Sequence, residues 1–351
     1  INDMFLLYLI ITILLLSGVK FYKAEYNAAY ISKEQCNCIK GFFIVVVFCR
    51  HIAPYLSDAG YDFSLLGDNL FRHIDCRIGQ LLVVMFLFYS GYGVMESIKK
   101  KGRNYIDSIP KRRLFTTLAN FDIAVLLFLV IDLCLNINYE TKDILLSFTA
   151  WKSVGNSNWY IFVILCCYLS TYMTFKVISR QHSSRKLIGG GNLLIITFIF
   201  LVLVLKKQSY WYDTIYSYPL GVYFSLYKAE LEDKIKKHYR FYLMITSFVF
   251  LFLFLIPYDV KGIIANMRAC SLAIIVVLLS LKFQVNSKPL VWLGKNLFPL
   301  YIYQRIGMII LSRIDGGEFI ANSPYLYIVL CAMMTLFFGW TYKYIQIKTN
   351  K

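Results

Sequence analysis

Charged residues are scarce in this 351-residue sequence. They make up 16% of it, against about 25% in soluble globular domains. Only 7 prolines are present, and we find no Pro/Ser-rich linker, low-complexity tract or internal repeat. The chain therefore has too few polar side chains to cover a water-facing surface, and no linker to divide it. These absences exclude a soluble protein and favour one domain over residues 1–351.

Motifs of soluble enzymes are also missing. The sequence has no Ser nucleophile elbow and no His-x-x-x-His metal pair, and the glycine run at 189–191 lacks the Lys-Ser/Thr of a phosphate-binding loop. The nine cysteines include Cys36 with Cys38 and the adjacent Cys166 and Cys167. Neither arrangement has the four spaced ligands of a zinc site. We therefore expect no bound metal.

Apolar residues are abundant and clustered instead. They make up 58% of the chain and fall in blocks long enough to cross a bilayer as helices. This pattern predicts an all-α, polytopic transmembrane helical bundle. We expect about eleven spans: 4–18, 39–56, 79–97, 116–135, 159–177, 191–205, 211–227, 240–257, 267–283, 297–312 and 324–342. The segment 211–227 contains Asp213 and Pro219, so it could instead be a broken or cavity-lining helix.

The net charge of +17 has a topological explanation. Most Lys and Arg lie in alternate loops: 19–38, 98–113, 178–190, 228–239, 284–296 and the tail after 342. Because Lys and Arg concentrate on the cytoplasmic side, we expect these loops and the C-terminus inside the cell and the N-terminus outside. The charge therefore does not indicate nucleic-acid binding. The dense cluster at 99–113 could also meet anionic lipid or an anionic ligand.

Two ionisable side chains share one face of the second predicted span. Lys40 and His51 are eleven residues apart, which leaves them within roughly 20° of alignment and about 16 Å apart along a helix. Ionisable groups within a bilayer often mark a functional site. Equally, Lys40 could extend to the boundary and His51 could bond a neighbouring helix. Arg50 must face a polar cavity, an acid or the outer interface.

Further polar residues follow in the next two spans. Ser90 to Gly93 form a small polar patch among aromatics, suited to close helix approach or to a ligand. Arg112 and Arg113 stand at the cytoplasmic start of the fourth span, where they would suit phosphate groups or serve as topological charges. Asp122 and Asp132 lie within that span, and we expect structural pairing with Arg50 or His51 more than catalysis.

Taken together, these features resemble acyltransferase family 3, integral-membrane proteins that include O-acetyltransferases of bacterial polysaccharides. The resembling segments are Lys40 to His51, FLFYSGYG at 86–93, PKRRLF at 110–115, GNSNWYIFVIL at 155–165 and WLGKNLFPLYIYQR at 292–305. Two positions depart from the family pattern. Lys40 stands where Arg is usual, and Gln304 with Arg305 occupies the place where many members carry His.

The resemblance implies a ten-helix core over 39–342, preceded by an extra N-terminal helix and loop at 1–38. It implies an enzyme of the cell membrane that moves an acyl group, expected to be acetyl, from cytoplasmic acyl-CoA (acetyl-CoA) to a hydroxyl of a cell-surface or lipid-linked glycan. No permanently bound cofactor is implied, and the partners would be acyl-CoA, the glycan acceptor and membrane lipids.

Residue roles follow from the same resemblance. His51 would be the general base, with a covalent acyl-histidine as the variant; the other histidines, His73, His182 and His238, lie in loops. The expected acyl-donor residues are Lys40, Arg112, Arg113, Ser90 and Tyr92. The expected substrate-cavity residues are Arg50, Trp159, Tyr301, Gln304 and Arg305.

Two other function classes stay open from the sequence. A polysaccharide or lipid-linked sugar transporter, or a polymerase, would also use broken helices and intramembrane charge. A membrane scaffold or inactive relative is the third, because the C-terminal histidine is missing. Binding or hydrolysis of acetyl-CoA separates an acyltransferase from a transporter.

Overall fold

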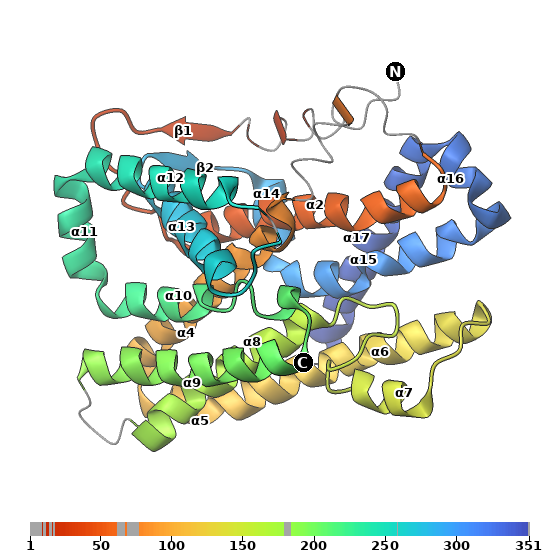
Figure 1. Cartoon of the computed structure of the whole chain (residues 1–351), viewed down its shortest axis with the longest axis horizontal. Coiled ribbons are helices and arrows are strands. Elements are labelled where there is room, and N and C mark those ends of the chain that lie inside the picture. Colours follow the sequence, from red (N-terminus) through yellow and green to blue (C-terminus); the bar gives the residue numbers. More distant parts are fainter. Residues whose placement is uncertain are drawn as a thin grey trace.

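The computed structural model describes residues 18–61, 77–178, 184–257 and 259–349, with a few short pieces outside these ranges. The chain is almost entirely helical (Figure 1). The helices are α2 (Lys33–Asp58), α4 (Val84–Lys101), α5 (Arg103–Ile109), α6 (Thr116–Cys134), α7 (Thr141–Ser147), α8 (Trp159–Met173), α9 (Arg185–Lys206), α10 (Ser217–Leu226), α11 (Lys228–Lys237), α12 (Tyr239–Leu255), α13 (Ile263–Ser280), α14 (Lys288–Lys295), α15 (Leu297–Ser312), α16 (Glu318–Asn322) and α17 (Pro324–Thr349).

Shorter elements complete the fold. Strands β1 (Val19–Phe21) and β2 (Phe283–Val285) pair antiparallel, with Lys20 opposite Gln284. Two π-helical segments, η2 (Pro110–Phe115) and η3 (Thr174–Ile178), extend α5 and α8. The 3₁₀ turns are η1 (Gly79–Val83), η4 (Ser209–Trp211) and η5 (Ile314–Gly317).

Seven helical segments among the described residues are long and apolar enough to cross a membrane, or eight if the bent pair α11 and α12 forms one span. The seven are Lys33–Asp58, Gly79–Lys101, Arg103–Cys134, Trp159–Val177, Arg185–Lys206, Ile263–Ser280 and Pro324–Tyr344. Each contains or overlaps a predicted span. The chain is therefore a multi-pass membrane protein, with fewer full-length spans than the eleven that we predicted.

The remaining predicted spans have separate explanations. The prediction at 211–227 is wrong as a full span: α10 has 10 residues, mostly buried, after the short turn η4. The segment 297–312 is α15 with the predicted bounds, but its 16 residues make a short helix. The segment 240–257 becomes α12, bent by 98° from α11. The predicted N-terminal span at 4–18 lies outside the described residues.

Two helix crossings depend on reciprocal glycines. A Cβ at Gly91 of α4 would lie 2.2 Å from the Tyr218 carbonyl oxygen, and one at Gly221 of α10 would lie 2.1 Å from that of Phe88. Helices α4 and α10 therefore touch backbone to backbone, as small residues allow within membranes. This contact explains why the short α10 is buried.

The second glycine crossing joins α2 to α14. A Cβ at Gly41 would lie 2.1 Å from the Leu290 carbonyl oxygen, and one at Gly294 would lie 1.9 Å from that of Asn37. The Ser287 hydroxyl caps α14 by accepting a hydrogen bond from the Leu290 amide. The crossing fixes Lys40 and Lys295, the neighbours of these glycines, on adjacent helices.

The Lys- and Arg-rich segments meet at one end of the bundle, here called the basic end. It comprises residues 19–40, 97–117, 174–178, 184–188, 226–241, 282–297 and 338–349. Lys176 pairs with Asp107 at 2.6 Å, and Arg185 pairs with Glu230 at 2.5 Å. Helix α11 runs across this end at 98° to α12 (Figure 1). The alternate-loop charge pattern of the sequence is therefore gathered on one side of the molecule.

Candidate active site

A cavity of about 410 Å³ opens at the basic end, between α2, α6, α8, α14, α15 and α17. Four cationic side chains line it: Lys40, Arg113, Lys295 and Lys343. Among the described lining residues there is no Asp or Glu. The other polar lining residues include Ser90, Thr116, Thr117, Asn120 and Asn296. The cavity therefore favours an anionic ligand that also offers hydrogen-bonding groups.

Arg113 is aimed into this cavity by an irregular helix. The π-helical segment Pro110–Phe115 links α5 to α6, and such segments often occur at functional sites. The Arg113 Nε donates a hydrogen bond to the Tyr105 hydroxyl at 3.1 Å, and its guanidinium lies 5.6 Å from the Tyr168 ring centroid. Arg112 is exposed and does not line the cavity. The structure thus separates two arginines that the sequence pairs.

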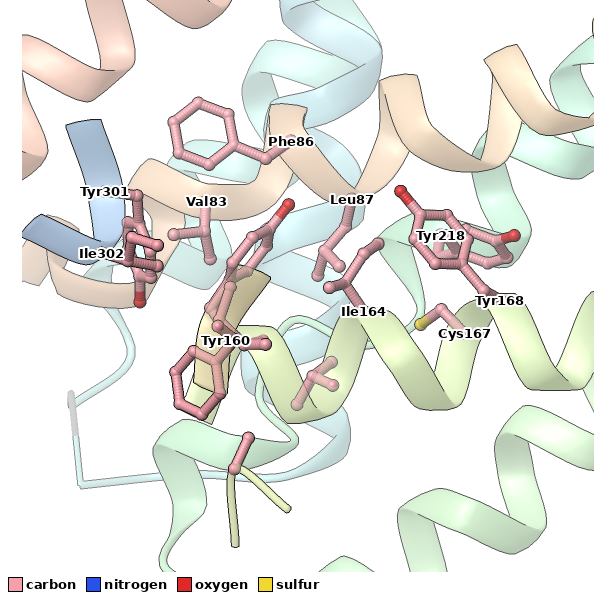
Figure 2. Packing of buried hydrophobic residues seen from close by; sticks show 14 of the residues in the cluster. Val83, Phe86, Leu87, Tyr160, Ile164, Cys167, Tyr168, Tyr218, Tyr301 and Ile302 are labelled. Carbon is pink, nitrogen blue, oxygen red and sulfur yellow. The ribbon is translucent and has the colours of Figure 1, made fainter. Parts of the chain in front are cut away.

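Two tyrosines form the inner wall of the cavity. Tyr160 of α8 and Tyr301 of α15 both line it, and their ring centroids are 5.2 Å apart. Both belong to the central cluster of buried side chains in Figure 2. The His51 ring lies beyond them, with its centroid 6.2 Å from that of Tyr301. His51 does not line the cavity itself, so Tyr301 stands between the basic opening and the histidine.

A polar cluster surrounds His51. Four buried polar atoms of α2 and α15 have no hydrogen-bond partner among the described residues: His51 Nδ1, the Tyr301 hydroxyl, Gln304 Oε1 and Arg305 Nε. Gln304 is held by its Nε2, which donates to the Tyr301 carbonyl at 2.9 Å. Buried polar groups are normally satisfied. A concentration of unsatisfied ones therefore suits a ligand with polar groups of its own.

Arg50 and Arg305 both lie close enough to His51 to act on it electrostatically. Asp122 and Asp132 form no ion pair within 4.0 Å in the part of the chain that the structure describes, and Asp132 lies near Tyr139 and Arg313 instead. Our expectation that these acids pair with Arg50 or His51 is therefore wrong. Asp132 lies near the C-terminal end of α6, beside Tyr139 and Arg313, and this neighbourhood replaces the predicted one.

Other predicted site residues lie away from the cavity. Tyr92 is on the far side of α4, where its ring centroid is 6.1 Å from that of Phe224. Trp159 is at the start of α8 and packs against Tyr210 at 6.0 Å. Neither lines the cavity. Of the loop histidines, His238 joins α11 to α12, while His73 and His182 lie outside the described residues.

The structure adds residues that sequence reasoning missed. Tyr160, Asn120, Lys295 and Lys343 line the cavity. Tyr160 is adjacent to Trp159, and Lys295 falls inside the segment 292–305, so both lay within segments already singled out. Asn120 and Lys343 carried no signal that the sequence could reveal. In the part of the chain that the structure describes, no group of three or more His, Cys, Asp or Glu side chains could hold a metal ion.

Comparison with known proteins agrees with this geometry. Neither the curated proteins nor the solved structures give a match. A family profile described as an acyltransferase domain matches residues 34–343. The matched region contains all of α2 except its first residue, every helix from α4 to α16, both tyrosines of the inner wall and all four cavity cations. The chain belongs to acyltransferase family 3 and is a membrane acyltransferase of that family.

Proposed function

We propose that this protein transfers an acetyl group from acetyl-CoA to a hydroxyl of a cell-surface or lipid-linked glycan, with His51 as general base. The observation that carries the proposal is the acid-free, four-cation cavity whose inner wall, Tyr160 and Tyr301, leads to His51. A transporter needs no site for an activated, polyanionic donor, whereas this cavity is suited to bind one. The family membership favours the acyltransferase for the same chain.

The donor is proposed to bind with its phosphates at the opening. Lys40, Arg113, Lys295 and Lys343 would contact them, since ammonium and guanidinium groups form strong charge-assisted hydrogen bonds to phosphate. The pantetheine arm would extend inward past Ser90 and the two tyrosines. Lys40 and His51 are separated by about 16 Å along α2. With the phosphates at Lys40 and the thioester at His51, the bound donor would therefore span roughly that distance. The extra polar atoms around His51 would contact the thioester end.

The reaction transfers the acyl group from the sulfur of the CoA thioester to the oxygen of the acceptor hydroxyl. The acceptor oxygen attacks the thioester carbonyl carbon while the His51 imidazole takes the hydroxyl proton. The carbon–sulfur bond then breaks, the CoA sulfur leaves as thiolate and takes up that proton, and an ester remains on the acceptor. A positioned base of this kind contributes typically 10²–10⁴-fold in rate.

The proposed orientation puts the basic end in the cytoplasm, with the C-terminus inside and the N-terminus outside. Support comes from the gathering of Lys- and Arg-rich segments at that end, because such segments are retained on the cytoplasmic side. Cytoplasmic acetyl-CoA would then reach the cavity directly. His51 lies deeper in the span, where an acceptor could approach from the opposite face.

Substitution His51→Gln tests the proposal. Purified protein in lipid vesicles is supplied with radiolabelled acetyl-CoA and membranes that carry the native glycan. We expect transfer to fall by about 10²–10⁴-fold, with acetyl-CoA binding and thermal stability retained. Full transfer by a stably inserted His51→Gln protein would refute His51 as base. No acetyl-CoA binding by the unmodified protein would refute the acyl-donor assignment itself.

A further inference from the structure

A second basic cavity lies at the same end of the molecule, apart from the candidate active site. Its volume is about 740 Å³, and it shares no lining residue with the first cavity. Six basic side chains line it: Lys23, Lys236, Lys237, His238, Arg240 and Lys282. Among the described lining residues there is no Asp or Glu. The acyl-transfer chemistry leaves this cavity unexplained.

Three distant parts of the chain build the cavity, namely residues 21–26, 236–243 and 279–283. The junction of α11 and α12 forms one wall, where the 98° bend brings Lys237 and Arg240 to the same opening. The segment after β1 forms another wall and is fastened there by the Tyr26 hydroxyl, which donates to the Lys236 carbonyl at 2.9 Å. Its ring centroid also lies 5.6 Å from that of Tyr239. The cavity is therefore fixed by tertiary contacts.

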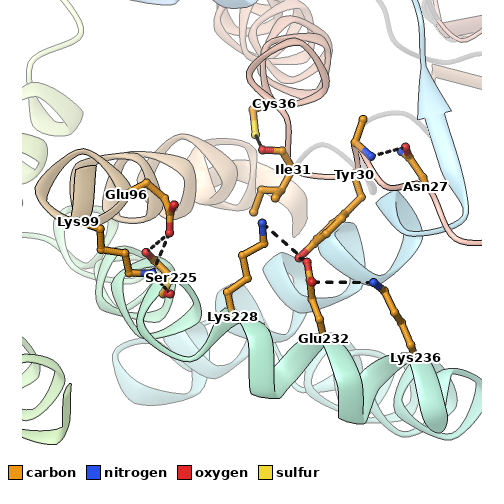
Figure 3. A network of polar contacts seen from close by, with 11 residues as sticks. Asn27, Tyr30, Ile31, Cys36, Glu96, Lys99, Ser225, Lys228, Glu232 and Lys236 are labelled. Carbon is orange, nitrogen blue, oxygen red and sulfur yellow. Dashed lines mark hydrogen bonds and ion pairs between the residues drawn. The ribbon is translucent and has the colours of Figure 1, made fainter. Parts of the chain in front are cut away.

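Two acids of α11 lie near this cavity, and of the cations that line it they pair with Lys236. Glu232 of α11 accepts a hydrogen bond from the Tyr30 hydroxyl at 2.5 Å and lies 3.8 Å from Lys228 and 3.9 Å from Lys236 (Figure 3). Glu230 pairs with Arg185.

The remaining cations of the cavity are unbalanced. Within the described part of the chain, no acid lies within 4.0 Å of the charged groups of Lys23, Lys237 or Arg240. Lys282 donates to the Glu25 carbonyl at 2.9 Å and lies over the Tyr26 ring at 4.1 Å, which leaves its charge unneutralised as well. Like charges that line one cavity repel one another, and an anion in the cavity would relieve that repulsion.

The surroundings indicate the source of the anion. Arg240 lies in the first turn of α12, and the apolar surface of that helix is turned outward: Phe241 is 56% exposed and Phe248 is 70% exposed. The cavity itself is also lined by Phe241, Leu243 and Phe283. The basic opening thus lies where an apolar, outward-facing helix begins, which is where phospholipid headgroups meet a membrane protein.

We propose that this cavity binds an anionic phospholipid, with its phosphate among Lys23, Lys237 and Arg240 and its first acyl carbons against Phe241 and Leu243. Basic pockets beside membrane-spanning helices bind such headgroups, and each Lys or Arg near the surface strengthens the attraction by about fivefold. A zwitterionic lipid carries no net charge and gains much less. Bound lipid would fasten the α11–α12 bend and the segment after β1 to the membrane surface.

Native mass spectrometry of the detergent-purified protein tests the proposal. The protein is titrated with phosphatidylglycerol, and with phosphatidylcholine as the zwitterionic comparison. The Lys237→Gln/Arg240→Gln double variant should bind phosphatidylglycerol roughly 25-fold more weakly. Lys23→Gln, on a separate wall, should bind it about fivefold more weakly and covers the case in which the double variant misfolds. The matched control is Lys100→Gln/Lys101→Gln, exposed at the basic end but outside the cavity.

Three results would overturn the proposal. One is equal loss of binding in the Lys100→Gln/Lys101→Gln control, which would indicate general surface charge. Another is equal binding of phosphatidylcholine and phosphatidylglycerol. The third is full displacement of the lipid by glycerol 3-phosphate or acetyl-CoA at comparable concentration, which would identify a soluble phosphate ligand instead.

Discussion

Substitution Gly294→Ala should separate α2 and α14, the two helices that carry the cavity residues Lys40 and Lys295. The added Cβ would lie 1.9 Å from the Asn37 carbonyl oxygen, and also 2.7 Å from its carbon, so the obstruction is backbone and cannot rotate away. Reaching an ordinary contact of 3.4 Å requires a shift of about 1.5 Å between α14 and α2. Lys295 and Lys40 would move apart by a similar amount.

The magnitude has two parts. Forcing an extra methyl into a packed contact costs about 1–3 kcal/mol of stability. A displacement of about 1 Å in a catalytic assembly can lower the rate by about 10²-fold. We expect weaker acetyl-CoA binding and a lower melting temperature together, because one crossing both stabilises the bundle and sets the spacing of the cations.

Thermal melting in detergent and acetyl-CoA binding by calorimetry measure these effects. The matched control is Gly93→Ala, another glycine within a helix, where a Cβ meets nothing within 4 Å. That variant should retain both properties, and the helix gains about 0.5–1 kcal/mol from losing a glycine. If Gly294→Ala proves as stable and binds acetyl-CoA as tightly as Gly93→Ala, the close crossing of α2 and α14 does not set the cavity.

Three further predictions concern single side chains. Arg113→Gln should weaken acetyl-CoA binding about tenfold or more, because charge-assisted hydrogen bonds contribute about 1.5–3 kcal/mol. The control Arg112→Gln, at an exposed position, should change binding little. Equal effects of the two substitutions in equilibrium binding would contradict the cavity geometry. Tyr301→Phe removes a buried hydroxyl that has no hydrogen-bond partner among the described residues, so the melting temperature should hold or rise while acetyl transfer falls. A loss of stability would show that the hydroxyl is bonded. The Asp213 Oδ1 accepts a hydrogen bond from the Gly262 amide at 2.8 Å, and burial raises the pKa of this carboxyl. The folded state therefore keeps the proton to a higher pH than the unfolded chain does. As a result, the protein loses stability as the pH rises above the ordinary pKa of an aspartic acid. Asp213→Asn should therefore melt at or above the wild-type temperature at neutral pH, and Asp213→Ala should be less stable by about 1–3 kcal/mol, as melting curves across pH would show.

Helix rotation explains which site predictions the structure separates. Lys40 and Arg113 line the cavity, while Arg112, one position earlier, is exposed. Successive residues on a helix point about 100° apart, and the π-helical segment changes that spacing locally. The sequence identifies a basic pair, but it cannot say which member faces inward. Tyr92 illustrates the same limit, because it lies on the face of α4 that packs against Phe224.

Hydropathy and charge, which are local properties, determined by themselves that this chain is a helical membrane protein with its cations grouped in alternate loops. Ordered motifs determined its family. Tertiary structure alone decided that 211–227 becomes a short buried helix, because Gly91 and Gly221 let α4 and α10 touch. It also decided that Lys343 joins Lys40 at one cavity. Contacts between residues some 300 positions apart depend on helix packing, and no local pattern in the sequence records them.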